Sequence, residues 1–188
     1  MIDYKKIIDK FYPEASKLRD ILLIHSRGVC QMALEIVDKH PELNADRDVV
    51  EAGAMLHDIG IVKCDAAGIE CFGTEPYICH GTIGGRMLRD NAAVLGVTAD
   101  EIEPFARICE RHTGTGLTLK QIEEQNLPLP HIDLCPVTVE EQIVCYADKF
   151  FSKTRPERQK TYEQACHSLE KFGKDGLVKF AEWHHMFA

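Results

Sequence analysis

Histidine and aspartate side chains occur at several points where the sequence is otherwise apolar. His57 and Asp58 stand side by side at the end of the run EAGAMLHDIG, residues 51–60. Burial of an imidazole or a carboxylate costs free energy unless the group has a partner. A divalent cation is such a partner, because it neutralises carboxylates and binds neutral imidazole nitrogens. The candidate metal ligands of this kind are His25, His57, Asp58, His80, His112 and Asp148.

A single polar residue on an apolar face would carry little weight. A lone buried histidine is more often a satisfied core residue than a ligand, and a buried aspartate more often caps a helix or pairs with a cation. Here several occur together, with few cations near them to neutralise the aspartates. Mixed nitrogen and oxygen ligands favour a transition metal over calcium. We therefore predict one or two divalent ions, with Fe or Mn first and Zn, Co, Ni or Mg as alternatives.

Amphipathic helices are expected to carry these side chains. His25 shares a stripe with Ile21 and Val29 inside a helical pattern. Capping-box patterns at Thr98 and Thr138 mark two further helix starts. The expected helices span residues 3–11, 14–39, 46–58, 80–90 and beyond, 98–112, 138–151, 156–172 and 174–186.

The sequence shows no convincing strand and no internal repeat. We predict an all-α fold, a compact bundle of about 7–9 helices, in a single domain over residues 1–188. The metal-binding core is expected over about residues 20–155, with the helices of 156–187 packed on it. Residues 61–79 and 113–137 are expected to be loops, the second unusually long, with three prolines and two glycines.

The order of these residues resembles the HD-domain superfamily of metal-dependent phosphohydrolases. LHDIG matches its most recognisable signature, and YADKF, with Asp148, is similar to the segment that carries its last aspartate. His80 in HGTIGG and His112 in ERHTGTG sit where the binuclear branch has two further ligands. The resemblance implies a first metal held by His25, His57, Asp58 and Asp148. It implies that Asp58 bridges to a second metal, held also by His80 and His112.

This resemblance implies a hydrolase of phosphoesters or phosphoanhydrides. In motif order and size the sequence is most similar to small bacterial hydrolases of dinucleoside polyphosphates, although the loop 113–137 is longer than expected there. Two bridged metals generate hydroxide near neutral pH and neutralise phosphoryl oxygens. Asp58 and Lys63 are the candidate catalytic residues. Phosphate binding is assigned to Lys63, Arg86, Arg111 and His131, with Arg89 a further cation; each could instead be a surface residue or form a local ion pair.

Two other functions stay open at this stage. A related HD-type protein could use two irons to activate dioxygen on a small polyol or phosphonate, and the ligands alone do not decide between the two reactions. A non-catalytic nucleotide-binding regulator is the third interpretation, although such proteins usually have incomplete ligand sets. The remaining histidines, His40, His167, His184 and His185, are expected at the surface.

Composition indicates which partners and which cellular compartment the protein is expected to have. The net charge of −8 argues against general nucleic-acid binding, and no apolar run is long enough to span a bilayer. The first residues, MIDYKKIIDKFYPEASK, lack the apolar core of a secretory signal. The eight cysteines are expected to be reduced thiols, with a cluster of Cys64, Cys71 and Cys79 as the alternative. We expect a cytoplasmic protein with a small phosphorylated partner; a homodimer stays open.

Overall fold

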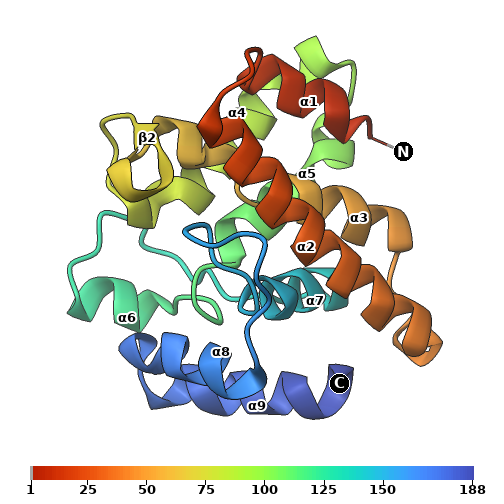
Figure 1. The fold of residues 1–188 in the computed structure, drawn as a ribbon, viewed down its shortest axis with the longest axis vertical. Coiled ribbons are helices and arrows are strands. Elements are labelled where there is room, and N and C mark those ends of the chain that lie inside the picture. Colours follow the sequence, from red (N-terminus) through yellow and green to blue (C-terminus); the bar gives the residue numbers. More distant parts are fainter. Residues whose placement is uncertain (1) are drawn as a thin grey trace.

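The structure is a computed structural model that describes residues 2–188, and it is built almost entirely of α-helices (Figure 1). The helices are α1 (Tyr4–Phe11), α2 (Lys17–Lys39), α3 (Arg47–Leu56), α4 (His80–Leu95), α5 (Ala99–Arg111), α6 (Leu119–Glu124), α7 (Val139–Asp148), α8 (Tyr162–Leu169) and α9 (Lys174–Phe187). Two short antiparallel strands, β1 (Asp65–Ala66) and β2 (Cys71–Phe72), form a small hairpin. The predicted all-α fold of about 7–9 helices is confirmed.

Local capping explains why the helices begin where they do. Asp46 accepts hydrogen bonds from the backbone N–H groups of Asp48 and Val49, which starts α3. Thr98 and Thr138 each form the predicted capping box, at α5 and α7. These starts follow from residues within one turn, so the sequence was sufficient to predict them.

Three local predictions were wrong. The loop 113–137 contains α6, which a Thr118–Gln121 capping box starts. The helix expected from residue 156 begins instead at α8, after a capping box at Thr161. The segment between α7 and α8 folds back, and the Lys160 backbone N–H donates to the Phe150 carbonyl oxygen at 2.7 Å. The strands β1 and β2 were also missed, since two residues each are too short for a period-two pattern.

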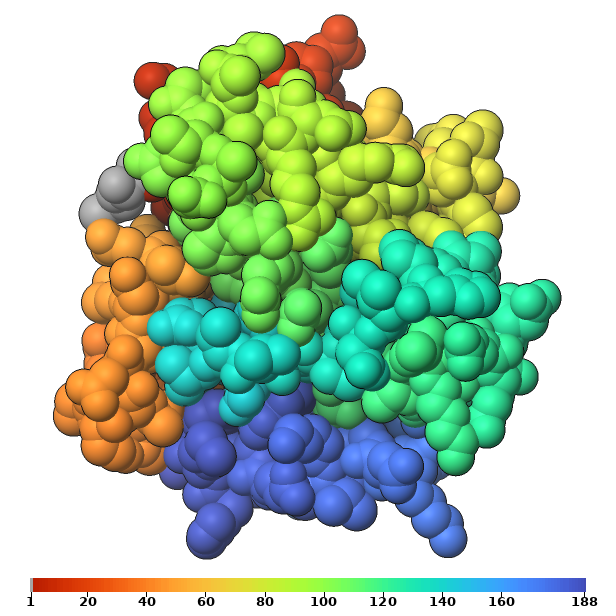
Figure 2. Space-filling view, turned by 180° about the vertical axis from the view of Figure 1, so that it is seen from behind, coloured from red at the N-terminus to blue at the C-terminus, as the bar shows by residue number. Residues whose placement is uncertain are grey.

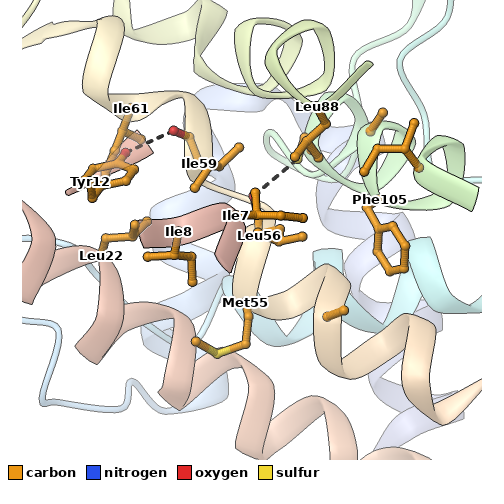
Figure 3. Close-up of a cluster of buried hydrophobic side chains, with 14 of the residues drawn as sticks. Ile7, Ile8, Tyr12, Leu22, Met55, Leu56, Ile59, Ile61, Leu88 and Phe105 are labelled. Carbon is orange, nitrogen blue, oxygen red and sulfur yellow. Dashed lines mark hydrogen bonds between the residues drawn. The ribbon is translucent and has the colours of Figure 1, made fainter. Parts of the chain in front are cut away.

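Two large apolar clusters hold the bundle together. The first joins α1, α2 and α3 to α4 and α5, with Leu22, Leu56 and Leu88 fully buried (Figure 3). The second joins α2, α3 and α7 to α8 and α9, which form the lower layer in Figure 1. The opposite face in Figure 2 shows the green segment near residue 100 and the cyan segment near residue 140 above the blue C-terminal helices. Because α2 and α3 contribute buried residues to both clusters, these two helices are covered on two sides.

Gly60 allows a close backbone contact between α4 and the short 3-10 helix Ile59–Lys63. A Cβ on Gly60 would lie 2.2 Å from the His80 carbonyl oxygen and 2.5 Å from the Gly84 nitrogen. The helix α3 has already ended at Leu56, so Gly60 does not terminate it. Its role is to let α4 approach.

None of the helices in the described part of the chain combines the length and apolar character that crossing a bilayer requires. All eight cysteines, which lie in this part of the chain, are free.

Candidate metal centre

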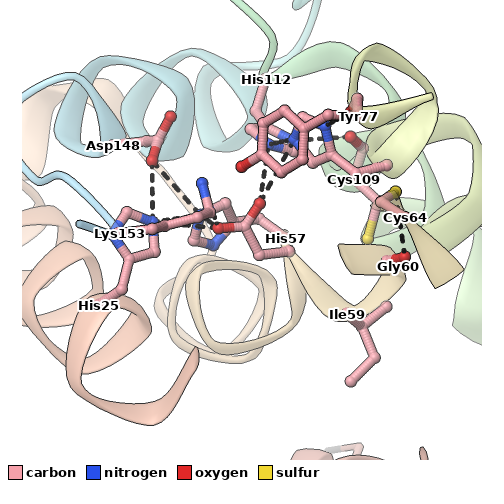
Figure 4. A network of polar contacts seen from close by, with 12 residues as sticks. His25, His57, Ile59, Gly60, Cys64, Tyr77, Cys109, His112, Asp148 and Lys153 are labelled. Atoms are coloured by element: carbon pink, nitrogen blue, oxygen red, sulfur yellow. Dashed lines mark hydrogen bonds and ion pairs between the residues drawn. The ribbon is translucent and has the colours of Figure 1, made fainter. Parts of the chain in front are cut away.

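The structure brings the six predicted ligand side chains to one buried place between the two halves of the bundle (Figure 4). His25 lies inside α2, whereas the other five stand at helix ends. His57 and Asp58 directly follow α3, and Asp148 is the last residue of α7. His80 begins α4, and His112 directly follows α5. Helix ends are suitable positions, because backbone groups without intrahelical partners are available there to hold the side chains.

Four donor atoms form the first ligand set, and they surround one point. The His25 Nε2 atom lies 3.1 Å from both Asp58 Oδ2 and Asp148 Oδ1, and 3.2 Å from His57 Nε2. The His57 Nε2 atom lies 3.2 Å from Asp58 Oδ2 and 3.5 Å from Asp148 Oδ1. Metal–nitrogen bonds of about 2.1 Å place adjacent ligands about 3.0–3.4 Å apart, for octahedral or tetrahedral angles. The observed spacing fits such a shell.

The second ligand set uses the other oxygen of Asp58. Asp58 Oδ1 lies 3.4 Å from His80 Nε2 and 3.3 Å from His112 Nε2. The two imidazole nitrogens are 2.9 Å apart. Asp58 therefore faces one donor set with each carboxylate oxygen, as a bridging ligand would.

The same backbone contact orients His57, His80 and His112. In each residue Nδ1 lies 2.7 Å from the carbonyl oxygen of the residue three positions earlier. A carbonyl oxygen only accepts, so Nδ1 carries the hydrogen, and in the neutral ring Nε2 directs a lone pair into the cluster. The lone pairs of His80 and His112 then face each other, an arrangement that a cation between them would stabilise.

The electrostatics of the cluster also fit bound cations. Burial favours the neutral acid of Asp58, but the Lys153 ammonium and the His57 imidazole outweigh it and hold the Asp58 pKa well below its usual range. Neither Asp58 oxygen accepts a hydrogen bond of good geometry, although Lys153 Nζ lies 2.7 Å from Oδ2. A buried carboxylate with nearby charges but no directed hydrogen bond is a suitable metal ligand.

The histidines of the two ligand sets differ in their affinity for protons. Burial opposes a charge on His57, but the Asp58 and Asp148 carboxylates outweigh burial and raise the His57 pKa to about 9. Burial and the neighbouring His112 lower the His80 pKa to about 3, and burial also lowers the pKa of His112. His80 and His112 are therefore neutral near pH 7, the form that binds a metal.

Most of the predicted phosphate-binding residues lie away from this cluster. Lys63 and Arg86 are exposed, and within residues 2–188 neither side chain makes a hydrogen bond or an ion pair. The His131 side chain is 71% exposed and lies 3.8 Å from Glu123. Arg111 donates to the Cys135 carbonyl oxygen at 2.8 Å and so ties down the loop before α7. The structure does not bring these four side chains to the predicted site.

The side chains of Arg89 and His184 also have structural partners. The Arg89 guanidinium pairs with Glu103 and Glu110 on α5. His184 is half-buried rather than exposed, because the Tyr146 hydroxyl lies 2.7 Å from its Nδ1 and Tyr162 stacks on its ring. His184 therefore lies at the surface with only part of its ring exposed.

Sequence reasoning missed two lysines that do reach the cluster. Lys149 Nζ donates to Asp148 Oδ2 and to the His112 carbonyl oxygen, both at 2.7 Å. Lys153 lies against Asp58 and above the Tyr77 ring, 5.9 Å from its centroid (Figure 4). The run DKFFSK after α7 carried the signal, since both lysines closely follow the ligand Asp148.

A cavity of about 410 Å³ opens beside the metal centre. Asp148, Lys149, Lys153 and Tyr77 line its inner end. Its outer walls combine apolar side chains of α8 with residues of the β1–β2 hairpin. A volume of this order accommodates a small metabolite or a nucleotide.

The fold and the site define a helical protein with two adjoining sets of residues that could hold metal ions. Comparison with known proteins agrees: the HD domain family matches residues 22–152, and the chain belongs to this family. No solved structure matches the chain.

Three curated relatives are similar to this chain over only part of their own length. A tRNA (cytidine(56)-2'-O)-methyltransferase of Picrophilus torridus is 35% identical over 72% of this chain and 33% of its own. The protein of the same name from Thermoplasma volcanium is 30% identical over 88% of this chain and 41% of its own. An uncharacterized protein of Methanocaldococcus jannaschii is 37% identical over 66% of this chain and 60% of its own. The chain thus spans between a third and three fifths of these relatives.

Proposed function

We propose that this protein is a metal-dependent phosphohydrolase that cleaves a phosphoester or phosphoanhydride bond in a small phosphorylated molecule such as a nucleotide. The observation that carries the proposal is Asp58, whose two oxygens face two separate donor sets. A pair of divalent metals held there, with iron or manganese as first candidates, would supply hydroxide near neutral pH and neutralise charge on phosphoryl oxygens.

The protein's own side chains would bind and orient the phosphoryl group of the substrate. Asp148 is the ligand that lines the cavity, so a phosphoryl group reaches the centre from that side. Lys153 and Lys149 stand at the same end and can stabilise the charge that develops on phosphoryl oxygens. His25, His57 and Asp58 are fully buried behind them, which excludes bulk water from the far side. In this proposal Lys153 takes the role that sequence reasoning gave to Lys63.

The other candidate functions find less support. An HD-type oxygenase would share the ligands, and a cavity lined by lysines suits a phosphorylated substrate or a phosphonate better than a neutral polyol, so it counts against the polyol alone. All six donors are in place, which favours an enzyme over a non-catalytic regulator. The methyltransferase name belongs to relatives of which this chain covers 33% and 41%, so that activity is not extended to it.

A reducing setting suits this proposal. The free cysteines support a protein that works in the cytoplasm, where thiols stay reduced.

Metal analysis combined with phosphate release tests the function. Protein purified without oxygen is expected to carry two metals per chain and to release phosphate from nucleotides or other phosphate esters. Asp58→Ala should abolish both, whereas Asp90→Ala, at an exposed position on α4, should retain both. A protein that holds two irons, releases no phosphate from a broad panel and consumes oxygen with a polyol would overturn the proposal.

A further inference from the structure

The cavity beside the metal centre contains more positive charge than one phosphate requires. Four lysines line it: Lys149, Lys153, Lys160 and Lys171. We infer that the site selects substrates that carry a chain of linked phosphates, and that Lys160 and Lys171 bind the phosphates beyond the one at the metals. This inference rests on the proposed function and names its substrate class.

The lysines fall into two pairs. Lys149 and Lys153 each have a carboxylate partner at 2.7 Å, Asp148 and Asp58. Lys160 and Lys171 make no ion pair with any residue among 2–188. Asp148 is the single carboxylate among the residues that line this cavity in the described chain, and Lys149 already neutralises it. The outer pair is therefore left for an anion from solution.

Lys160 is held in a fixed position. Its Nζ donates to the Lys149 carbonyl oxygen at 3.3 Å, and its backbone N–H donates to Phe150 at 2.7 Å. Burial lowers its pKa, and the charges of Lys149, Lys153 and Lys171 lower it further, against the opposite effect of Asp148. The four ammonium groups are thus close enough to repel one another, and a polyanion among them would relieve that repulsion.

A second cavity adjoins the first. It measures about 620 Å³ and shares Ser152, Thr154, Lys160 and Ser168 with the first. Arg155 and Arg158 add two more cations to its wall, against the single carboxylate of Glu163. Both cavities adjoin the segment between α7 and α8, which rises in front of the centre in Figure 1. Successive phosphates could therefore extend from the first cavity past Lys160, which lines both cavities, into the second.

Binding of inorganic phosphates tests the inference apart from any hydrolysis. Calorimetric titration of the protein as purified would compare orthophosphate with tripolyphosphate. Magnesium in excess over the ligand prevents the removal of bound metal. The variants are Lys160→Gln and Lys171→Gln, and Lys6→Gln, at an exposed position on α1, is the matched control.

Tripolyphosphate is expected to bind at least about tenfold more tightly than orthophosphate, since each lysine adds a charge-assisted contact. Lys160→Gln and Lys171→Gln should each lose most of this gain and leave orthophosphate binding unchanged, whereas Lys6→Gln should retain it. Equal affinities for the two ligands, or a gain that both variants keep, would overturn the inference. Tighter binding of a short oligoribonucleotide than of tripolyphosphate would also overturn it, because its phosphates are separated by nucleosides.

The two proposals can fail separately. If the protein prefers tripolyphosphate but releases phosphate from no substrate, the proposed hydrolase function is wrong and the inferred binding site for linked phosphates stands. If the protein hydrolyses only monophosphate esters and shows no preference for tripolyphosphate, the proposed hydrolase function stands and the inferred selection of substrates with linked phosphates is wrong.

Discussion

The replacement Gly60→Ala tests how the second metal-ligand set is held. The new Cβ would lie 2.2 Å from the His80 carbonyl oxygen, 2.5 Å from the Gly84 nitrogen and 2.9 Å from its Cα. These are backbone atoms, so no side chain can rotate away. Because unstrained contacts need about 3.5 Å, α4 would have to move away by about 1 Å. Overpacking of this kind costs about 2–3 kcal/mol, which lowers the Tm by about 4–12 °C.

The same movement would displace His80 from Asp58. Metal sites tolerate ligand displacements of about 0.2 Å, so the second metal should be lost. The first should remain, because His25, His57 and Asp148 do not lie on α4. Thermal unfolding and metal content per chain measure the two effects.

Gly68→Ala is the matched control, since a Cβ there meets nothing within 4 Å. Its stability should stay within about 0.5 kcal/mol of the wild type. If Gly60→Ala instead kept the wild-type Tm and two metals, the close approach of α4 would not be what holds the second ligand set.

Three further predictions concern ligands, pH and the lower layer. Asp58→Ala should lose both metals and His80→Ala mainly the second, by elemental analysis; equal losses in the two variants would refute the bridging role. Because the His57 pKa is raised to about 9 in the metal-free chain, metal must displace a proton. Metal affinity should therefore rise by about tenfold per pH unit between about pH 7 and 9 and level off above, and a flat profile would contradict this. Tyr146→Phe removes the hydroxyl that bonds His184 and should cost about 1 kcal/mol in denaturant unfolding, with an unchanged metal content as the internal control.

The six candidate metal ligands, which the structure brings together, could be picked out because each has a strong local signal. His25 interrupts an apolar helical stripe, and LHDIG places two polar groups at a helix end. The capping boxes at Thr98 and Thr138 fixed the starts of α5 and α7, and so where those helices deliver His112 and Asp148. These signals come from residues within a few positions of one another.

The cations around the site were not predictable in this way. Lys63 lies closer in sequence to His57 and Asp58 than Lys153 does, but the 3-10 helix Ile59–Lys63 leaves its side chain exposed. The segment after α7 folds back instead, so that Lys153, 95 positions after Asp58 in the numbering, meets it at 2.7 Å. The position of a long side chain depends on how its loop packs, and no local pattern encodes that packing.

The sequence by itself was enough to predict most of the helices, the starts of α5 and α7 at their capping boxes and the six candidate donors, because periodicity and capping are properties of neighbouring residues. The tertiary structure alone decided which cations line the cavity, and it gave Gly60 its role. Both depend on segments far apart in the chain, whose contact is set by the packing of the whole bundle.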